Sequence, residues 1–169
     1  YLKFFKNSKS LPVDKFYQNV LYDKKIGYYN SKQPFGKQGD FITSPKVSKL
    51  FSEIIAIWII STWEVFEKPE NFNIVELGPG DGTLANTLLG VFKQFPEFNF
   101  AKKFFLFEES KFLKKVQKRN IKNKDIKWIK DFKDIKKGPI VFFGNEFFDA
   151  IPIKQFKRKN NILFEKYYV

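Results

Sequence analysis

Short apolar runs alternate with segments of helical spacing between residues 72 and 145. Strands that alternate with helices are typical of a parallel sheet whose helices pack against its faces. The pattern therefore predicts a three-layer α/β fold, with a mostly parallel sheet and helices on both faces. The expected strands span residues 72–77, 104–108, 126–129 and 140–145, and the expected helices span residues 83–95 and 111–119.

The segment before this α/β region has a different pattern. Apolar residues at helical spacing predict a short amphipathic helix over residues 11–21. Residues 27–45 hold three glycines and two prolines without periodicity, which predicts a functional loop. Ser44 and Pro45 are typical of a helix start, and we expect a largely buried helix from there to about Trp63.

The end of the chain has a turn pattern of its own. Residues 153–156 and 162–167 lie on either side of Lys159-Asn160-Asn161, which predicts a hairpin. We expect two parts in the chain: an N-terminal helical and loop extension over residues 1–66, and an α/β domain over residues 67–169.

Composition narrows the classes of protein. With 43% hydrophobic and 20% aromatic residues among 169, the chain can bury one compact core. Its net charge of +13 would suit a nucleic acid, an anionic membrane face or an acidic protein as partner. The same charge is also typical of proteins from an organism that uses lysine to solvate its helices. The longest strongly apolar run, residues 54–60, is far shorter than the roughly 20 residues that span a bilayer, so we expect no membrane insertion.

Cysteine and histidine are both absent from the sequence. Their absence excludes disulfide scaffolds, thiolate nucleophiles, Cys-ligated zinc and hydrolytic triads built on histidine. Carboxylates, hydroxyls, tyrosine and lysine remain as candidate chemical groups, and we predict no metal site. Methionine is absent too and the sequence opens at Tyr1, so we expect either a fragment or a sequence from which some residues are missing.

The most informative stretch is a strand that enters a glycine-rich turn and then a helix, Glu76-Leu77-Gly78-Pro79-Gly80-Asp81-Gly82-Thr83. Glycines at alternate positions, Gly78, Gly80 and Gly82, let the backbone pass close to a ligand. The spacing differs from the G-x-G-x-x-G dinucleotide motif, and the Lys-Ser/Thr pair of a P-loop is absent. The turn therefore disfavours a diphosphate ligand.

Two carboxylates accompany this turn. Glu76 lies on the strand just before it, where an acid suits a cationic ligand, and S-adenosylmethionine carries both a sulfonium and an ammonium group. Glu108 ends the next strand, where the doubly wound fold engages ribose hydroxyls, and we prefer it to Glu109. Together with the three glycines, these acids predict a site for S-adenosylmethionine.

A third group of polar residues follows the last strand of the α/β region, in Asn145-Glu146-Phe147-Phe148-Asp149-Ala150-Ile151-Pro152. At the carboxyl end of a central strand, Asn145, Glu146 and Asp149 would face the crevice in which open α/β sheets bind ligands. The same residues could instead cap the start of a helix.

Four motifs, in their order along the chain, together resemble the MidA family. They are GYY at residues 27–29, GDFITSP at 39–45, VELGPGDGTL at 75–84 and NEFFDAIP at 145–152. That family is the mitochondrial complex I assembly-factor type of protein arginine methyltransferase, with bacterial relatives, and the resemblance covers about residues 12–169. Lys46 departs from the family, which usually has Glu after Ser-Pro, and the chain ends before the family's C-terminal half.

The resemblance implies a Rossmann-like class I S-adenosylmethionine-dependent methyltransferase that methylates an arginine of a protein such as a respiratory complex I subunit. A protonated guanidinium is a poor nucleophile, so carboxylates have to hold it in a bidentate fork, and Glu146 and Asp149 are the available pair. Asp40 could close over the methyl donor or help to bind the substrate. We expect the mitochondrial matrix in a eukaryote and the cytoplasm in a bacterium. The expected cofactor residues are Glu76, Gly78, Gly80, Gly82, Glu108 and Asn145.

Two other functions stay open. An RNA methyltransferase would fit the positive charge and the many aromatic residues. However, base-methylating enzymes usually have Asp/Asn-Pro-Pro-aromatic after the fourth strand, and Asn145-Glu146-Phe147-Phe148 puts an acid there instead. The other possibility is a binding or assembly protein that keeps the cofactor fold without turnover.

Overall fold

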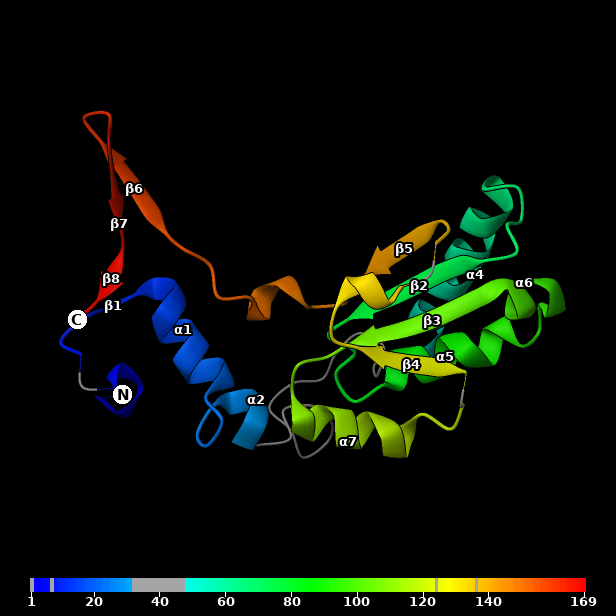
Figure 1. Cartoon of the computed structure of the whole chain (residues 1–169), viewed down its shortest axis with the longest axis horizontal. Coiled ribbons are helices and arrows are strands. Elements are labelled where there is room, and N and C mark those ends of the chain that lie inside the picture. The colour runs from blue at the N-terminus through cyan, green and yellow to red at the C-terminus, as the bar shows by residue number, and fades with distance from the viewer. Residues whose placement is uncertain (1, 7, 32–47, 124, 136) are drawn as a thin grey trace.

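Four parallel strands in the order β4-β3-β2-β5 form the central sheet of the protein (Figure 1). All four coincide with or overlap the strands predicted from the sequence, so the predicted α/β fold is confirmed. The strands are β2 (Phe72–Leu77), β3 (Lys102–Phe107), β4 (Ile126–Ile129) and β5 (Ile140–Phe143). The computed structural model describes residues 2–6, 8–31, 48–123, 125–135 and 137–169.

Helices connect these strands and pack against the sheet. The predicted helix over residues 83–95 ends early, and a second helix begins at Pro96, because proline has no N–H to continue a helix but is well tolerated as its first residue. Gly82, in a left-handed conformation, precedes the helix that follows the glycine turn. The helices are α4 (Lys49–Val65), α5 (Thr83–Phe92), α6 (Pro96–Ala101) and α7 (Lys111–Asn120).

The main core lies between the sheet and the helices α4, α5 and α6. Its largest fully buried side chains are aromatic: Phe72, Phe92, Phe98 and Phe104. In Figure 1, α4 and α5 lie on the far side of the sheet. The opposite face carries a smaller cluster formed by Val75, Phe105 and Ile129, with Ile135 packed against it. Within the described residues the α-helices contribute only to the larger cluster, so the predicted helices on the second face of the sheet stay a prediction.

The two ends of the chain pair with each other beside the sheet domain (Figure 1). Leu11 and Pro12 form an antiparallel bridge with Tyr168 and Tyr167, and the rings of Phe16 and Tyr168 lie 4.6 Å apart. The elements here are η1 (Leu2–Phe5), β1 (Leu11–Pro12), α1 (Val13–Tyr22), α2 (Tyr28–Ser31), β6 (Phe156–Lys159), β7 (Ile162–Glu165) and β8 (Tyr167–Tyr168). The division of the chain at residue 66 stays a prediction.

Several local predictions need correction. The first hairpin strand is residues 156–159 rather than 153–156, because Asn160 and Asn161 both have positive φ and make a two-residue turn that the strands must flank directly. The predicted loop begins with the short helix α2.

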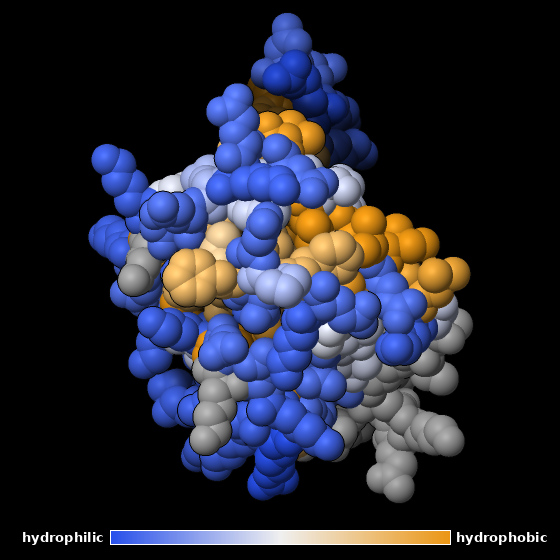
Figure 2. Space-filling model, turned by 90° about the vertical axis from the view of Figure 1, so that its right-hand side faces the viewer, coloured by the Kyte–Doolittle hydropathy of each residue, from blue (hydrophilic) through white to orange (hydrophobic). Residues whose placement is uncertain are grey.

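The predicted helix start at Ser44 lies outside the described residues, within which α4 begins at Lys49. The helix is not largely buried as predicted, because one of its faces exposes apolar side chains, and Figure 2 shows a hydrophobic patch on this side of the molecule. The exposed residues are Leu50, Ile54, Ile57 and Trp58. Within the described part of the chain, no helix is long and apolar enough to cross a membrane.

Candidate functional site

Two adjoining cavities open at the carboxyl ends of β2, β3 and β5. The first, which we name the Glu76 cavity, has a volume of about 390 Å³, and the second, the Glu108 cavity, about 330 Å³. Both are lined by the glycine turn, by the segment that follows β5 and by the N-terminal tyrosines. The residues common to the two linings are Tyr29, Gly78, Gly80, Glu146 and Ala150.

The glycine turn forms the floor of both cavities. Gly78 and Gly82 have φ angles of +60° and +84°, which side chains rarely adopt. A Cβ atom at Gly78 would lie 2.6 Å from the ring of Phe147, and one at Gly82 would lie 2.8 Å from the side chain of Ile121. The turn therefore requires glycine at these positions, both for its conformation and for its packing.

Glu76 is buried at the bottom of its cavity, with 2% of its surface exposed. Burial, and secondly the nearby carboxylate of Asp81, raises the pKa of Glu76 to about 8. Its Oε2 atom is buried and has no hydrogen-bond partner among the described residues. A buried carboxylate oxygen of this kind is costly unless a donor or a cation reaches it.

Glu108 lies in the second cavity and is held by two hydrogen bonds. Its Oε1 atom accepts from the backbone N–H of Ser110 at 2.8 Å, and its Oε2 atom accepts from the side-chain amide of Gln117 at 3.0 Å. Burial raises the pKa of Glu108, and these hydrogen bonds oppose that shift by stabilising the ionised form. Each carboxylate oxygen keeps a lone pair for a hydroxyl donor.

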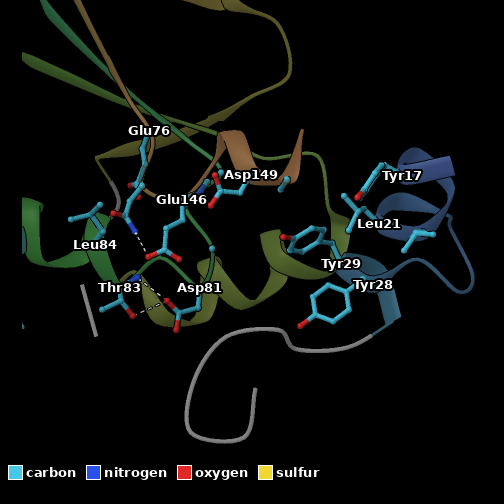
Figure 3. Close-up of a pocket in the computed structure, with 16 residues that line it drawn as sticks. Tyr17, Leu21, Tyr28, Tyr29, Glu76, Asp81, Thr83, Leu84, Glu146 and Asp149 are labelled. Carbon is cyan, nitrogen blue, oxygen red and sulfur yellow. Dashed lines mark hydrogen bonds between the residues drawn. The ribbon is translucent and has the colours of Figure 1, made fainter. Parts of the chain in front are cut away.

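Asn145, Glu146 and Asp149 line the Glu76 cavity together with the glycine turn. Figure 3 shows Glu146 and Asp149 near Asp81 of that turn. Glu146 has a φ angle of +54°, an uncommon conformation for a residue with a side chain, and it lines both cavities. The amide of Asn145 donates to Glu146 Oε1 at 3.4 Å. The short helix η3 (Phe148–Ala150) that follows has no side-chain cap, so these polar groups do not act as caps.

Tyrosines of the N-terminal helices form the opposite wall, a feature that the sequence reasoning missed. Tyr17, Tyr28 and Tyr29 line the Glu76 cavity, and Figure 3 shows the last two across from Glu146. The hydroxyl of Tyr22 donates to the carbonyl of Ala150 at 2.8 Å, which links α1 to the segment after β5. Burial raises the pKa of Tyr22 to about 12, so this hydroxyl keeps its proton at neutral pH.

The structure thus brings eight of the nine predicted site residues to one edge of the sheet. Asp40 lies outside the described residues, and its role stays a prediction. The others line one or both cavities, except Gly82, which ends the turn that the cavities share. They are Glu76, Gly78, Gly80, Gly82, Glu108, Asn145, Glu146 and Asp149.

Comparison with known proteins agrees with this geometry. Residues 54–169 match the model of a family described as "Putative S-adenosyl-L-methionine-dependent methyltransferase". The chain belongs to this methyltransferase family. The resemblance to MidA-type methyltransferases and the predicted cofactor are therefore confirmed at the level of the family.

Curated relatives of the family carry a more specific name. The chain is 34% identical over 168 residues to the mitochondrial "Protein arginine methyltransferase NDUFAF7 homolog" of Drosophila melanogaster. It is 32% identical over 177 residues to the mitochondrial "Protein arginine methyltransferase NDUFAF7" of Homo sapiens. These alignments cover 85% and 90% of this chain but 38% and 40% of the relatives, so the chain spans about two fifths of their length.

A solved bacterial structure shares the fold. A methyltransferase-like protein from Burkholderia thailandensis, crystallised with S-adenosyl-homocysteine, superposes with a TM-score of 0.75 at 22% identity. The superposition covers 97% of this chain and 43% of the bacterial chain. At this identity the likeness supports the fold of the family.

Proposed function

We propose that the protein transfers a methyl group from S-adenosylmethionine to the guanidinium group of an arginine in a protein. The observation that carries the proposal is the position of Glu146. This carboxylate lies where the Glu76 and Glu108 cavities meet, and its backbone is strained. Strained residues with functional side chains are concentrated at active sites.

The residues present fit S-adenosylmethionine. Glu108 offers two carboxylate oxygens to the ribose hydroxyls, so the adenosyl half belongs in the Glu108 cavity. The unpartnered Oε2 of Glu76 suits the ammonium group of the methionine half. Gly78 and Gly80 let the backbone approach the ligand between these two acids. The cavities also contact each other, as one ligand with two halves requires.

The acceptor side has the groups that guanidinium chemistry needs. S-adenosylmethionine supplies a methyl group bonded to a sulfonium, whose carbon is attacked in line with the departing sulfur. Glu146 and Asp149 would bind the guanidinium through paired hydrogen bonds and stabilise its charge. One of the two carboxylates would accept the proton that the attacking nitrogen loses, while the sulfur leaves as a neutral thioether. Tyr28 and Tyr29 offer aromatic faces to the same cation.

The printed names of the relatives support a protein arginine as substrate. The resemblance stated from the sequence motifs makes a respiratory complex I subunit the leading candidate among proteins. We further propose the matrix as the compartment in a eukaryotic host, since the curated relatives are mitochondrial, and the cytoplasm in a bacterial host. An RNA substrate is disfavoured because two acids, Glu146 and Asp149, face the site where phosphates would lie.

A radiolabelled methyl donor tests the proposal directly. The intact protein is incubated with labelled S-adenosylmethionine and with total protein or total RNA from cells that lack it, and the labelled products are hydrolysed and identified. We expect methylarginine, lost in the Glu146→Gln variant and kept in Asp134→Asn, an exposed acid on the short helix η2 (Phe132–Asp134). Labelled nucleosides would favour the RNA alternative. No labelled product from an intact protein that binds the cofactor would favour the assembly alternative.

A further inference from the structure

One buried side chain joins the two halves of the proposed cofactor site. Gln117 of α7 is 0% exposed. Its Nε2 atom donates to the carbonyl oxygen of Gly80 at 2.8 Å and to Glu108 Oε2 at 3.0 Å. Its Oε1 atom accepts from the indole N–H of Trp128 in β4 at 2.8 Å. These three bonds connect α7, the glycine turn and the strands β3 and β4.

The chemistry of the partners fixes the orientation of this amide. A carbonyl and an ionised carboxylate only accept hydrogen bonds, and an indole N–H only donates. A flipped amide would turn its oxygen toward Gly80 and Glu108 and its NH₂ group toward the N–H of Trp128. All three hydrogen bonds would then be lost, so only the observed orientation satisfies the buried groups.

We infer that Gln117 is a positioning residue. It holds the glycine turn and the ribose-binding carboxylate of Glu108 in the relative position that S-adenosylmethionine requires. This inference rests on the proposed function, because it assumes that Glu108 binds the ribose. The carboxylate is held on one oxygen by Ser110 and on the other by Gln117. Without the amide, Glu108 can rotate away from the ribose, and the turn at Gly80 can move independently of it.

The inference makes a prediction that a structural role alone does not make. If Gln117 holds Glu108 for the ribose 2′-hydroxyl, its loss should weaken binding of S-adenosylhomocysteine more than binding of the 2′-deoxy analogue, which lacks that hydroxyl. A general loss of stability would weaken both ligands alike. The preference for the ribo ligand, taken as the ratio of the two dissociation constants, therefore isolates the positioning role.

The experiment compares variants of the intact protein by calorimetric titration with both ligands. Gln117→Met keeps the length of the side chain but removes its hydrogen bonds, and we expect the ribo preference to fall by about tenfold, the value of one hydrogen bond to a charged acceptor. Trp128→Phe removes the indole N–H that fixes the orientation of the amide, so the amide can flip part of the time, and the ribo preference should fall by less than in Gln117→Met. Ile60→Ala opens a cavity in the core next to α5 and serves as the stability control.

The outcomes are distinct. A preference that falls in Gln117→Met and stays unchanged in Ile60→Ala, at similar losses of melting temperature, supports the positioning role. An unchanged preference in Gln117→Met overturns it, and so does an equal fall in Ile60→Ala. If Gln117→Met does not fold, an unchanged preference in Trp128→Phe overturns the inference. If the unaltered protein binds neither ligand, the proposed function itself fails.

Discussion

Glu108 and the glycine turn are held by buried hydrogen bonds, whereas Glu146 and Asp149 stand exposed at the same edge of the sheet. Both oxygens of Glu108 accept hydrogen bonds of 2.8 and 3.0 Å, and the turn is tied to Gln117. On the acceptor side, the hydrogen bond from Asn145 to Glu146 is 3.4 Å long, and the backbone at Glu146 is strained.

Under the proposed function, this difference corresponds to two tasks in one site. The cofactor is the same in every reaction cycle, so rigid, buried polar groups can bind it, and such groups lose little entropy on binding. A protein side chain that has to enter and leave needs an open side, with charged groups that water can reach. We therefore expect changes on the cofactor side to act on binding of S-adenosylmethionine, and changes on the acceptor side to act on turnover.

The largest effect is expected on the acceptor side. Glu146→Gln removes the negative charge that would hold the guanidinium, so kcat should fall by about 100-fold or more, the cost typical of losing one charged group that stabilises a transition state. The dissociation constant for S-adenosylmethionine should change by less than about threefold, since the cofactor contacts remain. Single-turnover methylation assays and titrations together measure both numbers. If kcat and the affinity for S-adenosylmethionine fell by the same factor, the distinction between the cofactor side and the acceptor side would be wrong.

The next effect is on the cofactor side. Gly78→Ala places a methyl group 2.6 Å from the Phe147 ring and forces a side chain onto a positive φ, so we expect cofactor affinity to fall by about 30-fold. The matched control is Gly90→Ala, in α5, where an added Cβ meets no atom within 4 Å and helix propensity predicts stabilisation by about 1 kcal/mol. Thermal unfolding and titration distinguish the two variants, and normal binding by Gly78→Ala would contradict the assigned turn.

A pH dependence follows from Glu76. With its pKa raised to about 8 by burial, this carboxyl is mostly neutral at pH 6 and increasingly ionised toward pH 8. Because a ligand ammonium favours the ionised form, affinity for S-adenosylmethionine should rise several-fold over that interval. Burial also links Glu76 to stability, because it raises the pKa of the folded state above the ordinary value of 4.5. The contribution of Glu76 to the free energy of unfolding is therefore full below about pH 4.5 and is lost as pH rises to about 8.

Glu76→Gln provides the control for this pH dependence. The variant keeps the shape of the side chain but cannot ionise, so only the titration of the ligand's own amine remains, with an ordinary pKa of about 8. Calorimetric titrations at pH 6, 7 and 8 compare the two proteins. An identical pH dependence in both would show that Glu76 does not meet the ammonium group.

The smallest effect is expected at the contact between α1 and the segment that follows β5. Tyr22→Phe removes the hydrogen bond to the carbonyl of Ala150 and leaves the ring in place. One neutral hydrogen bond is worth about 1 kcal/mol, so KM for the protein substrate should rise by about fivefold or less while cofactor affinity stays the same. Steady-state kinetics against both substrates test this, and a loss of cofactor affinity alone would place Tyr22 on the cofactor side.

Much of the α/β region could be predicted because its pattern is strong and local. The strands 72–77 and 126–129 have the predicted bounds, and the glycine turn between strand and helix lies where its spacing indicates. The acids at the strand ends followed from the topology of parallel sheets, in which carboxyl ends share one edge. Local pattern and fold therefore agree in this region.

Other features depend on contacts between distant segments, which a single sequence does not reveal. Tyr22 and Ala150 are 128 residues apart, and the bridge between β1 and β8 joins the two ends of the chain. Gln117 was overlooked because it lies among lysines, which indicate a solvated helix. Its spacing with Leu113 and Ile121, four residues to either side, nevertheless places it on the buried face of α7.

The most direct test of the account is a calorimetric titration of the intact protein with S-adenosylmethionine, repeated with Glu108→Ala, Gly80→Val and Glu146→Gln. We predict roughly micromolar binding by the unaltered protein and by Glu146→Gln, and a loss of at least about tenfold in the other two variants. Absence of binding by the unaltered protein would contradict the cofactor site. Unchanged binding by both Glu108→Ala and Gly80→Val would place the cofactor elsewhere.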